Sequence, residues 1–425
     1  MNETVADVLV DDATHLSGRV RIRVERAHGD ANGAVALRWL PAKFVGNTMH
    51  AAVGSVVCDG SLCIVSGAGR VLDLTLRWTL PPVCATDHDL GVRDATCGEG
   101  RYGTAEGVLT LGNFLPAEIA SPSRLPGYTR GDVMQAERGV WRVHIDAPAE
   151  LQWFTNASSA RATEVGVRRH WQFRTVARDL SAVAGVGYRT VALPGAGNGV
   201  LALRSPDPRC PDEAVAARIQ SAYGWYSDTL WRRDSTGLTV VEVPRLFARA
   251  TEYDGMYIFD RGACDAITVG HEVAHQWFGA DLASDEMSEP WIDEGLAMWA
   301  DYSWLHATDP TWTAGAVVAN VRAAFAAANG DVPGDLPIGE YPDIATRQFA
   351  VYVKSSIFFE RTRQAMGPAF VPWLAMRRGR RLVAGAELIG SADAGAPARF
   401  AHDVHELHAA DDLIEPDWQW GASGR

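Results

Sequence analysis

Hydrophobic and polar residues alternate along the first 183 residues in a way that predicts β-strands. Val20 and Ile22 alternate with arginines, Leu72–Trp78 repeats the same period of two, and Trp141–Asp146 follows it again. Successive side chains of a strand point to opposite faces of a sheet, so this period favours strands with one buried face. Gly-rich turns separate the runs. We therefore expect an N-terminal, antiparallel β-sheet domain over residues 1–183.

The pattern becomes mainly helical from residue 184 onward. Two strand-like runs come first, Val200–Leu203 and Leu238–Val243, and apolar residues then recur at helical spacing. The Ala-rich and Val-rich stretch Ala314–Asn329 predicts a packed helix. The chain as a whole is thus predicted to be an α+β, multidomain protein. Its expected parts are residues 1–183, a mainly helical domain over 184–375, and a short C-terminal extension over 376–425.

One predicted helix carries residues that can bind a metal ion. The segment His271–His275 reads HEVAH, and Asp265 precedes it as a helix-capping residue while Gly279 ends the pattern. Positions four apart lie on one face of a helix, so His271 and His275 can direct both imidazoles at one ion. Glu272 lies beside that face and can reach a water molecule on the metal.

A third ligand is expected from the next predicted helix. Eighteen residues separate His275 from Glu294, which lies about one turn into a helical pattern opened by Pro290. A polar loop joins the two helices and can return Glu294 to the two histidines. Three protein ligands with an open fourth position are typical of catalytic zinc. We predict one Zn2+ per chain held by His271, His275 and Glu294, since this ligand set suits zinc better than other metals.

These segments resemble peptidase family M1, the gluzincin zinc aminopeptidases that include aminopeptidase N and leukotriene A4 hydrolase. The similarity rests on HEVAHQWFG followed by WIDEGLA. Asp293 and Ala280 stand where the family commonly has asparagine. The resemblance implies a thermolysin-like catalytic domain over 184–375. It also implies that the large C-terminal helical domain of many family members is absent, because little chain remains for it.

The resemblance extends to residues that would bind substrate. Residues 249–256, RATEYDGM, are similar to the family segment whose glutamate binds the free amino terminus, which places Glu252 in that role. Asn113, within LGNFLP, stands where the family has a loop near the substrate's first side chain. Tyr352, within AVYVKSS, matches the tyrosine that donates a hydrogen bond to the oxyanion, with Ser355 in place of a glycine.

A mechanism follows from this set of residues. Zinc activates water and polarises the scissile carbonyl, Glu272 acts as general base and then as general acid, and Tyr352 stabilises the oxyanion. With Glu252 as the amine anchor, the expected activity is that of an aminopeptidase. The alternative is a specialised M1-like hydrolase with endopeptidase, epoxide-opening or biosynthetic chemistry, which the altered Arg249–Thr251 stretch keeps open.

Composition narrows the classes of partner. A net charge of −13 argues against a general nucleic-acid binder, and no run of eighteen apolar residues predicts a membrane span. The expected partner is a peptide or small-molecule substrate. The first twelve residues lack the features of a signal peptide, which predicts a cytoplasmic protein. The alternative is a secreted or periplasmic mature form, because Cys58–Cys63 and Cys84–Cys97 are spaced for short-loop disulfides. The other interpretations of these cysteines are reduced thiols or a four-cysteine metal site.

Overall fold

The computed structural model divides the chain into two compact units, which are described separately. The first comprises Met1–Ala216 with Ser235–Cys264, and the second comprises Ala217–Asp234 with Asp265–Arg425. The described residues are 2–12, 14–24, 34–44, 46–67, 71–84, 97–98, 100–119, 136–233, 237–246, 248–328, 332–379, 381–390, 395, 397–398 and 420.

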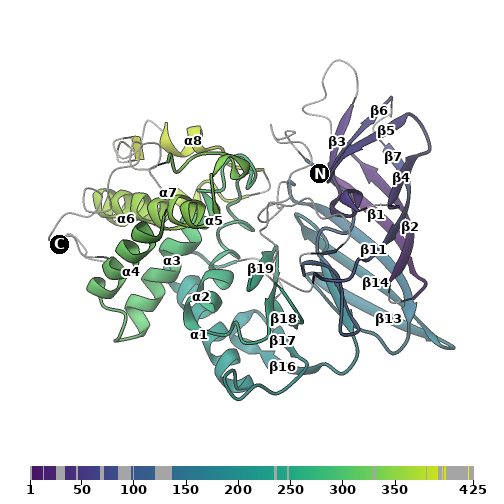
Figure 1. Ribbon diagram of the computed structural model, residues 1–425, viewed down its shortest axis with the longest axis horizontal. Helices are drawn as coiled ribbons and strands as arrows, with labels where there is room; N and C mark the ends of the chain where they lie inside the picture. Colours follow the sequence, from purple (N-terminus) through teal and green to yellow (C-terminus); the bar gives the residue numbers. More distant parts are fainter. Residues whose placement is uncertain are drawn as a thin grey trace. The chain divides into compact units, whose positions relative to one another are not determined.

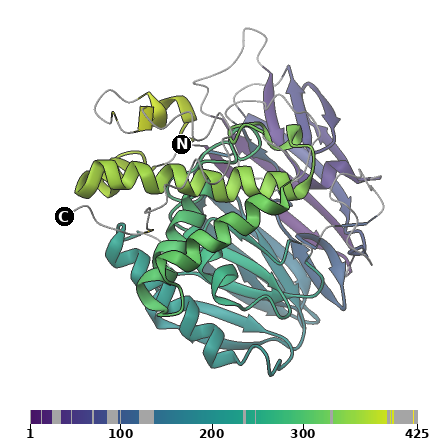
Figure 2. The same cartoon turned by 60° about the vertical axis from the view of Figure 1, so that its left-hand side comes forward.

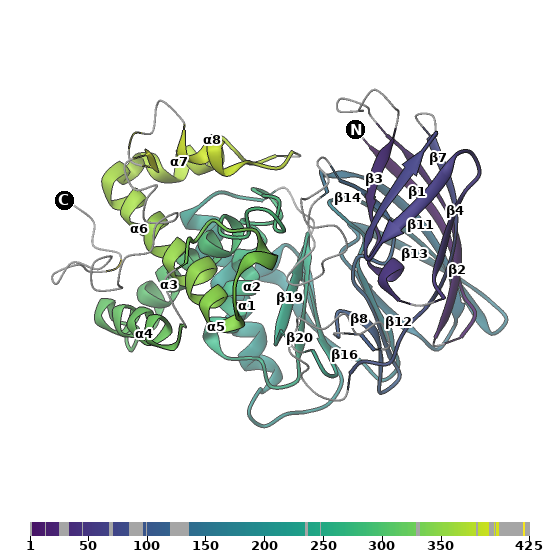
Figure 3. The ribbon, with the colours of Figure 1, turned by 45° about the horizontal axis from the view of Figure 1, so that its top comes forward.

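A seven-stranded sheet dominates the first unit (Figures 1 and 3). Its order is β13-β14-β11-β1-β2-β7-β4. The strands are β1 (Glu3–Val10), β2 (His15–Arg23), β4 (Thr48–Ala51), β7 (Val71–Thr79), β11 (Gly139–Pro148), β13 (Ser159–Val165) and β14 (Arg168–Ala177). In β2, Val20 and Ile22 are buried while their arginine neighbours are exposed, as the alternation predicts. The sheet is mostly antiparallel, but β1 runs parallel to β11. A long intervening stretch allows this, because parallel neighbours need a crossover connection rather than a hairpin.

Two four-stranded sheets complete the β-rich part of the first unit, in the orders β10-β3-β6-β5 and β12-β15-β9-β8. Their strands are β3 (Val35–Arg38), β5 (Ser55–Asp59), β6 (Leu62–Ser66), β8 (Tyr102–Ala105), β9 (Val108–Leu111), β10 (Ala117–Glu118), β12 (Gln152–Thr155) and β15 (Ala182–Gly185). Together with the large sheet they enclose one apolar core that includes Trp39, Trp78 and Phe114.

A five-stranded sheet in the same unit carries the segment with Glu252. Its order is β16-β17-β18-β20-β19, which makes β19 an edge strand. The strands are β16 (Arg189–Leu193), β17 (Gly199–Leu203), β18 (Thr239–Val243), β19 (Ala250–Tyr253) and β20 (Met256–Asp260). Strands β17, β18 and β20 run parallel, whereas β19 pairs antiparallel with β20. Both strand-like runs predicted after residue 184 are therefore strands of this sheet.

Three disulfides lie in the first unit. They join Cys58 to Cys63, Cys84 to Cys97, and Cys210 to Cys264. The six cysteines are thus disulfide-bonded rather than reduced or arranged around a metal ion. The first bridge links two residues that face each other across β5 and β6.

The second unit is helical (Figures 1 and 2). Its helices are most of α1 (Asp212–Thr229), then α2 (Ala266–Ala274), α3 (Asp293–Thr308), α4 (Ala314–Ala327), α5 (Ile344–Arg347), α6 (Ser355–Met366), α7 (Phe370–Ala375) and α8 (Gly385–Ile389). A π-helical segment, Gln348–Lys354, joins α5 to α6, so that the three run end to end (Figure 2). The helix predicted over 314–329 is present as α4 up to Ala327, with Asn329 outside the described residues, and within α4 only Val317 and Val321 are buried. Across the described residues, the helices are too short or too polar to span a bilayer.

Close packing of α2 against α3 sets the position of the HEVAH segment. Gly270 lies in this contact, where a side chain at that position would meet the Asp301 carboxylate at 2.1 Å and the Trp304 ring at 2.7 Å. Glycine is therefore required immediately before His271. The hydroxyl of Tyr226, on α1, also donates to the Gly270 carbonyl at 3.0 Å. Three helices thus fix the backbone beside the first histidine.

Candidate metal centre and active site

The two histidines come from the end of α2. Asp265 caps the helix through its Oδ1 atom, which accepts from the Thr268 backbone N–H at 3.1 Å, as the sequence predicts. The regular helix ends at Ala274, earlier than the predicted end at Gly279, and His275 is its C-cap. His275 nevertheless keeps helical backbone angles and its N–H bonds to the His271 carbonyl at 3.1 Å. Both imidazoles therefore stay on one face.

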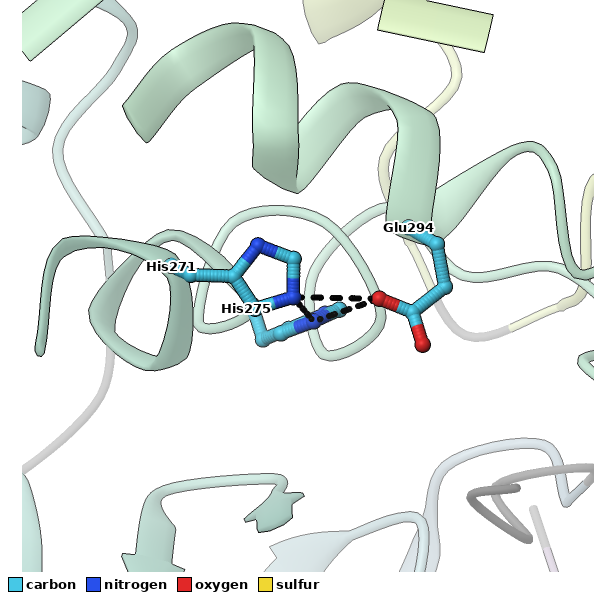
Figure 4. A group of neighbouring side chains, drawn as sticks. All are labelled: His271, His275 and Glu294. Atoms are coloured by element: carbon cyan, nitrogen blue, oxygen red, sulfur yellow. Dashed lines mark hydrogen bonds and ion pairs between the residues drawn. The ribbon is translucent and has the colours of Figure 1, made fainter. Parts of the chain in front are cut away.

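Glu294 closes the group from the first turn of α3 (Figure 4). The Nε2 atoms of His271 and His275 lie 3.0 Å apart, and the Glu294 Oε2 atom lies 3.1 and 3.3 Å from them. Ligand atoms about 2.0–2.1 Å from a tetrahedral zinc ion are about 3.3 Å from one another. The three atoms therefore already have nearly the spacing that a zinc ion requires. Among the described residues, no other group of three potential ligands converges in this way.

The protonation states of the group also suit a metal ion. Burial lowers the pKa of His271, and the neighbouring His275 lowers it further, which favours the neutral imidazole. Burial alone would raise the pKa of Glu294, but its contacts with His271 and His275 outweigh that cost and hold the pKa below its usual range. Metal binding needs neutral imidazoles and an ionised carboxylate.

A hydrogen bond to the backbone orients the second histidine. His275 Nδ1 lies 3.0 Å from the Phe278 carbonyl oxygen and donates to it. This contact places the proton on Nδ1 and leaves the Nε2 lone pair directed at Glu294 and His271. The backbone turn that supplies the carbonyl also brings the Ala280 N–H to the His275 carbonyl at 3.0 Å. Ala280 thus contributes through its backbone, whatever its side chain.

Glu272 and Tyr352 complete the group around the ligands. Glu272 follows His271 on α2 and is 6% exposed, so its carboxylate is held in a largely dry environment. The Tyr352 hydroxyl donates to the Glu294 Oε1 atom at 2.5 Å, and its ring lies 5.7 Å from that of His271. Tyr352 thus lies beside the metal ligands, and its catalytic role stays a prediction.

A π-helical turn presents Tyr352 to Glu294. Ser355 follows this turn, and its hydroxyl donates to the Ala350 carbonyl at 3.1 Å. A side chain at Gly295 would meet the Ser355 Cβ atom at 2.4 Å, so α3 and α6 approach closely beside Glu294. π-Helical turns occur frequently at functional sites, because they shift the direction of one residue relative to the helix around it.

Asp293 is the position where the family commonly has asparagine. It is 1% exposed, and its Oδ1 atom accepts from the Glu294 backbone N–H at 2.9 Å. The carboxylate therefore stabilises the first turn of α3, where acidic residues are favoured by the helix dipole. The change from asparagine leaves the three ligands in place.

The remaining predicted site residues, Glu252 and Asn113, lie in the first unit. Glu252 is 3% exposed and stands on the edge strand β19. Asn113 has φ of 47° and is largely buried, and its Nδ2 atom donates to the Asp179 carboxylate at 3.2 Å. The Asn113 amide is thus engaged within its own unit. The substrate-binding roles of both residues stay predictions from the family resemblance.

The sequence did not reveal a buried polar network beside Glu252, centred on Asp254 and Asn156. Asp254 accepts two hydrogen bonds from Arg138, and Asn156 donates to the backbone carbonyls of Asp179 and Asp254. The Asp254-Gly255 dipeptide is a recognisable turn signal. Its partners are distant in sequence, however, so no local pattern could have identified them.

One part of the chain matches a known protein family. Residues 260–369 match the peptidase family M1 domain. The rice (Oryza sativa subsp. japonica) aminopeptidase M1-B is 45% identical over 47 residues, which are 11% of this chain and 5% of that protein. Rabbit (Oryctolagus cuniculus) aminopeptidase N is 41% identical over 44 residues, or 10% of this chain and 5% of that protein. The aligned parts thus span only a small share of these relatives.

Solved structures share the fold over nearly the whole chain. An M1 zinc metallopeptidase from Deinococcus radiodurans superposes with a TM-score of 0.66 and 17% identity, covering 95% of this chain and 93% of that one. Aminopeptidase A from Legionella pneumophila, solved with aspartic acid, gives a TM-score of 0.64 and 12% identity, covering 95% of this chain and 49% of that one. The whole chain therefore shares the fold of M1 zinc metallopeptidases, and its residues 260–369 carry the match to the family M1 domain.

Proposed function

We propose that this protein is a zinc aminopeptidase that removes amino-terminal residues from peptides. The observation that carries the proposal is the metal centre, in which three ligand atoms converge within 3.0–3.3 Å of one another beside a buried acid and a tyrosine hydroxyl. A mutant of the Deinococcus enzyme has been solved with a Tyr-Ser-Ala substrate, so one protein of this fold binds a short peptide.

Each side chain has a distinct task in peptide hydrolysis. His271, His275 and Glu294 hold the zinc ion, which when bound acts as a Lewis acid that polarises a carbonyl and acidifies water. The Glu272 carboxylate accepts a proton from the attacking water and returns it to the leaving amine. The Tyr352 hydroxyl, which donates to Glu294 at 2.5 Å, can instead donate to the oxygen on which negative charge develops.

Glu252 provides the specificity for a free amino terminus in this proposal. An ammonium group that enters a largely dry site needs an anionic partner, and a carboxylate is the side chain that supplies one. Binding of the amino group fixes the distance from the chain end to the bond that is cleaved. The enzyme would then release single residues rather than cut within a peptide.

The test is an assay of the zinc-loaded protein against fluorogenic aminoacyl amides and their N-acetylated twins. We expect cleavage of the free-amine set alone, and loss of that cleavage in Glu272→Gln with zinc still bound. Cleavage of the acetylated set alone would contradict the role of Glu252 and favour an endopeptidase. No cleavage of either set, with zinc bound, would favour the alternative of a specialised hydrolase for a non-peptide substrate.

We further propose that the protein works in an oxidising compartment, as a secreted or periplasmic form. The support is the pairing of six cysteines into three disulfides. Structural disulfides are rare where glutathione and thioredoxin keep thiols reduced. Expression in a reducing and in an oxidising host, followed by thiol titration of the unfolded protein, tests this. Full activity with six free thiols would contradict it.

A further inference from the structure

The turn that follows Glu252 is fixed by an unusual set of contacts. Strands β19 and β20 form a hairpin in which Tyr253 pairs with Met256, so Asp254 and Gly255 are the two turn residues. The Asp254 carboxylate accepts from Arg138 Nε at 2.7 Å and from an Arg138 terminal nitrogen at 2.8 Å. It also accepts from the backbone N–H of Arg178 at 3.2 Å. The carboxylate is 5% exposed, so these charge-assisted bonds form away from water.

The partners of the turn lie at the ends of three separate strands of the β-rich part of the first unit. Arg138 precedes β11, Asn156 follows β12, and Arg178 follows β14. Asn156 Nδ2 donates to the Asp254 carbonyl at 3.0 Å, and Asn156 Oδ1 accepts from the Ser181 N–H at 3.1 Å. The turn is therefore held at both its side chain and its backbone by residues far from it in sequence.

Glu252 lies two residues before Asp254 in the chain. Tyr253 packs into an apolar cluster with Met256 and Ile258, and its hydroxyl approaches the backbone of Gly112. Neighbouring residues of a strand point to opposite faces, so Glu252 projects from the face opposite to Tyr253. The Tyr253 contacts fix one side of the strand, and the Asp254 contacts fix how far the strand extends. Both limit the movement of the Glu252 carboxylate.

We propose that Asp254, held by Arg138, is a positioning residue that places the Glu252 carboxylate for binding the substrate's amino group. The inference rests on the proposed function, in which Glu252 is the amine anchor. Asp254 does not contact substrate in this scheme. Its effect is on the affinity for a free amino terminus, and the chemical step carried by Glu272 and Tyr352 is left intact.

The experiment compares Asp254→Asn and Arg138→Gln with the parent protein. We expect each variant to raise KM for free aminoacyl amides roughly tenfold, the equivalent of one charge-assisted hydrogen bond, with kcat and zinc content unchanged. Because the two side chains act as one unit, the double variant should raise KM no further than either single variant. Hydrogen exchange of residues 250–259 should be faster in the variants.

A matched control separates positioning from a general loss of ion pairing. Arg21 and Asp73 form a pair of the same 2.7 Å length on an exposed sheet face, so Asp73→Asn should leave KM unchanged. If Asp254→Asn does not fold, Arg138→Lys takes its place, because it keeps the charge but loses the paired geometry. An intermediate KM would support the proposal, and a parental KM would count against it.

The outcomes distinguish this inference from the proposed function. If Glu252→Gln raises KM while folded Asp254→Asn and Arg138→Gln do not, Glu252 is the anchor and the positioning role is wrong. If Glu252→Gln leaves KM unchanged, or the parent protein cleaves only acetylated substrates, the proposed function itself is wrong and the positioning role falls with it. A fall in kcat alone would indicate a merely structural role.

Discussion

The metal centre of the second unit and the Asp254 network of the first unit are both buried and polar, but they bring together different kinds of polar group. In the network, Asp254 faces hydrogen-bond donors from Arg138 and Arg178. In the metal centre, the Nε2 atoms of His271 and His275 face each other at 3.0 Å, and both face a carboxylate oxygen. One cluster pairs donors with acceptors, whereas the other gathers lone pairs at one point.

This difference shows how function can be recognised in a buried cluster. Unpaired polar groups in an apolar interior cost free energy, so folding normally matches each acceptor to a donor. A cluster whose donors and acceptors pair with one another stabilises one arrangement of the chain. A cluster of converging lone pairs requires a cation to complete it. We therefore expect metal removal, a change of pH and substitution to affect the two regions differently.

Removal of zinc gives the largest expected contrast. A ligand that binds only the folded state stabilises it by about 4 kcal/mol at a free concentration a thousand times its Kd. We therefore expect chelation to lower the free energy of unfolding by an amount of that order. Hydrogen exchange should accelerate in α2 and α3 and stay unchanged in β11 and β14. Equal stability with and without zinc would contradict the assignment of the metal centre.

Substitution of Tyr352 should affect chemistry without affecting the metal. Tyr352→Phe removes the hydroxyl that donates to Glu294, while the three ligands remain. Loss of one oxyanion donor typically lowers kcat by about 100-fold to 1,000-fold. Steady-state kinetics with zinc analysis of the same sample measures both effects. A variant that loses zinc in proportion to activity would show that Tyr352 supports the ligands rather than the reaction.

The Asp254 network should respond to pH. Burial raises the pKa of Asp179 to about 7, the hydrogen bond from Ser181 opposes this rise, and the charge of Asp254 adds to it. The folded state therefore retains a proton that the unfolded state loses at lower pH. This contribution to stability is full below the ordinary pKa of 3.8 and is lost as pH rises through about 7.

Substitution of Asp179 tests that titration. In the parent protein, the unfolding free energy should change by on the order of 3 kcal/mol between pH 4 and pH 7. Asp179→Asn removes the ionisable group, so the variant should lose this change. Denaturant unfolding at several pH values measures the effect, and Asp73→Asn on the exposed face serves as the control. An unchanged pH dependence would show that Asp179 is ionised throughout this range.

The sequence predicted the metal centre well because its residues obey local spacing. His271 and His275 are one helical turn apart, so helical periodicity aligns them, and a short polar loop returns Glu294 at the start of the next helix. The same reasoning found β2, β7 and β11, whose alternation marks a half-buried sheet. Contacts made across long sequence distances were not predictable in this way. The parallel pairing of β1 with β11 and the Arg138–Asp254 ion pair join segments that no local pattern relates.

The π-helical turn at Gln348–Lys354 makes the orientation of Tyr352 sensitive to insertions and deletions. Such a turn holds one residue more than an α-helix would, and each α-helical residue rotates its successors by about 100°. The orientation of Tyr352 toward Glu294 therefore depends on the exact number of residues in this segment. A one-residue deletion between Gln348 and Tyr352 would therefore turn the hydroxyl away from the metal ligands. The number of residues in this segment thus determines whether the Tyr352 hydroxyl faces Glu294.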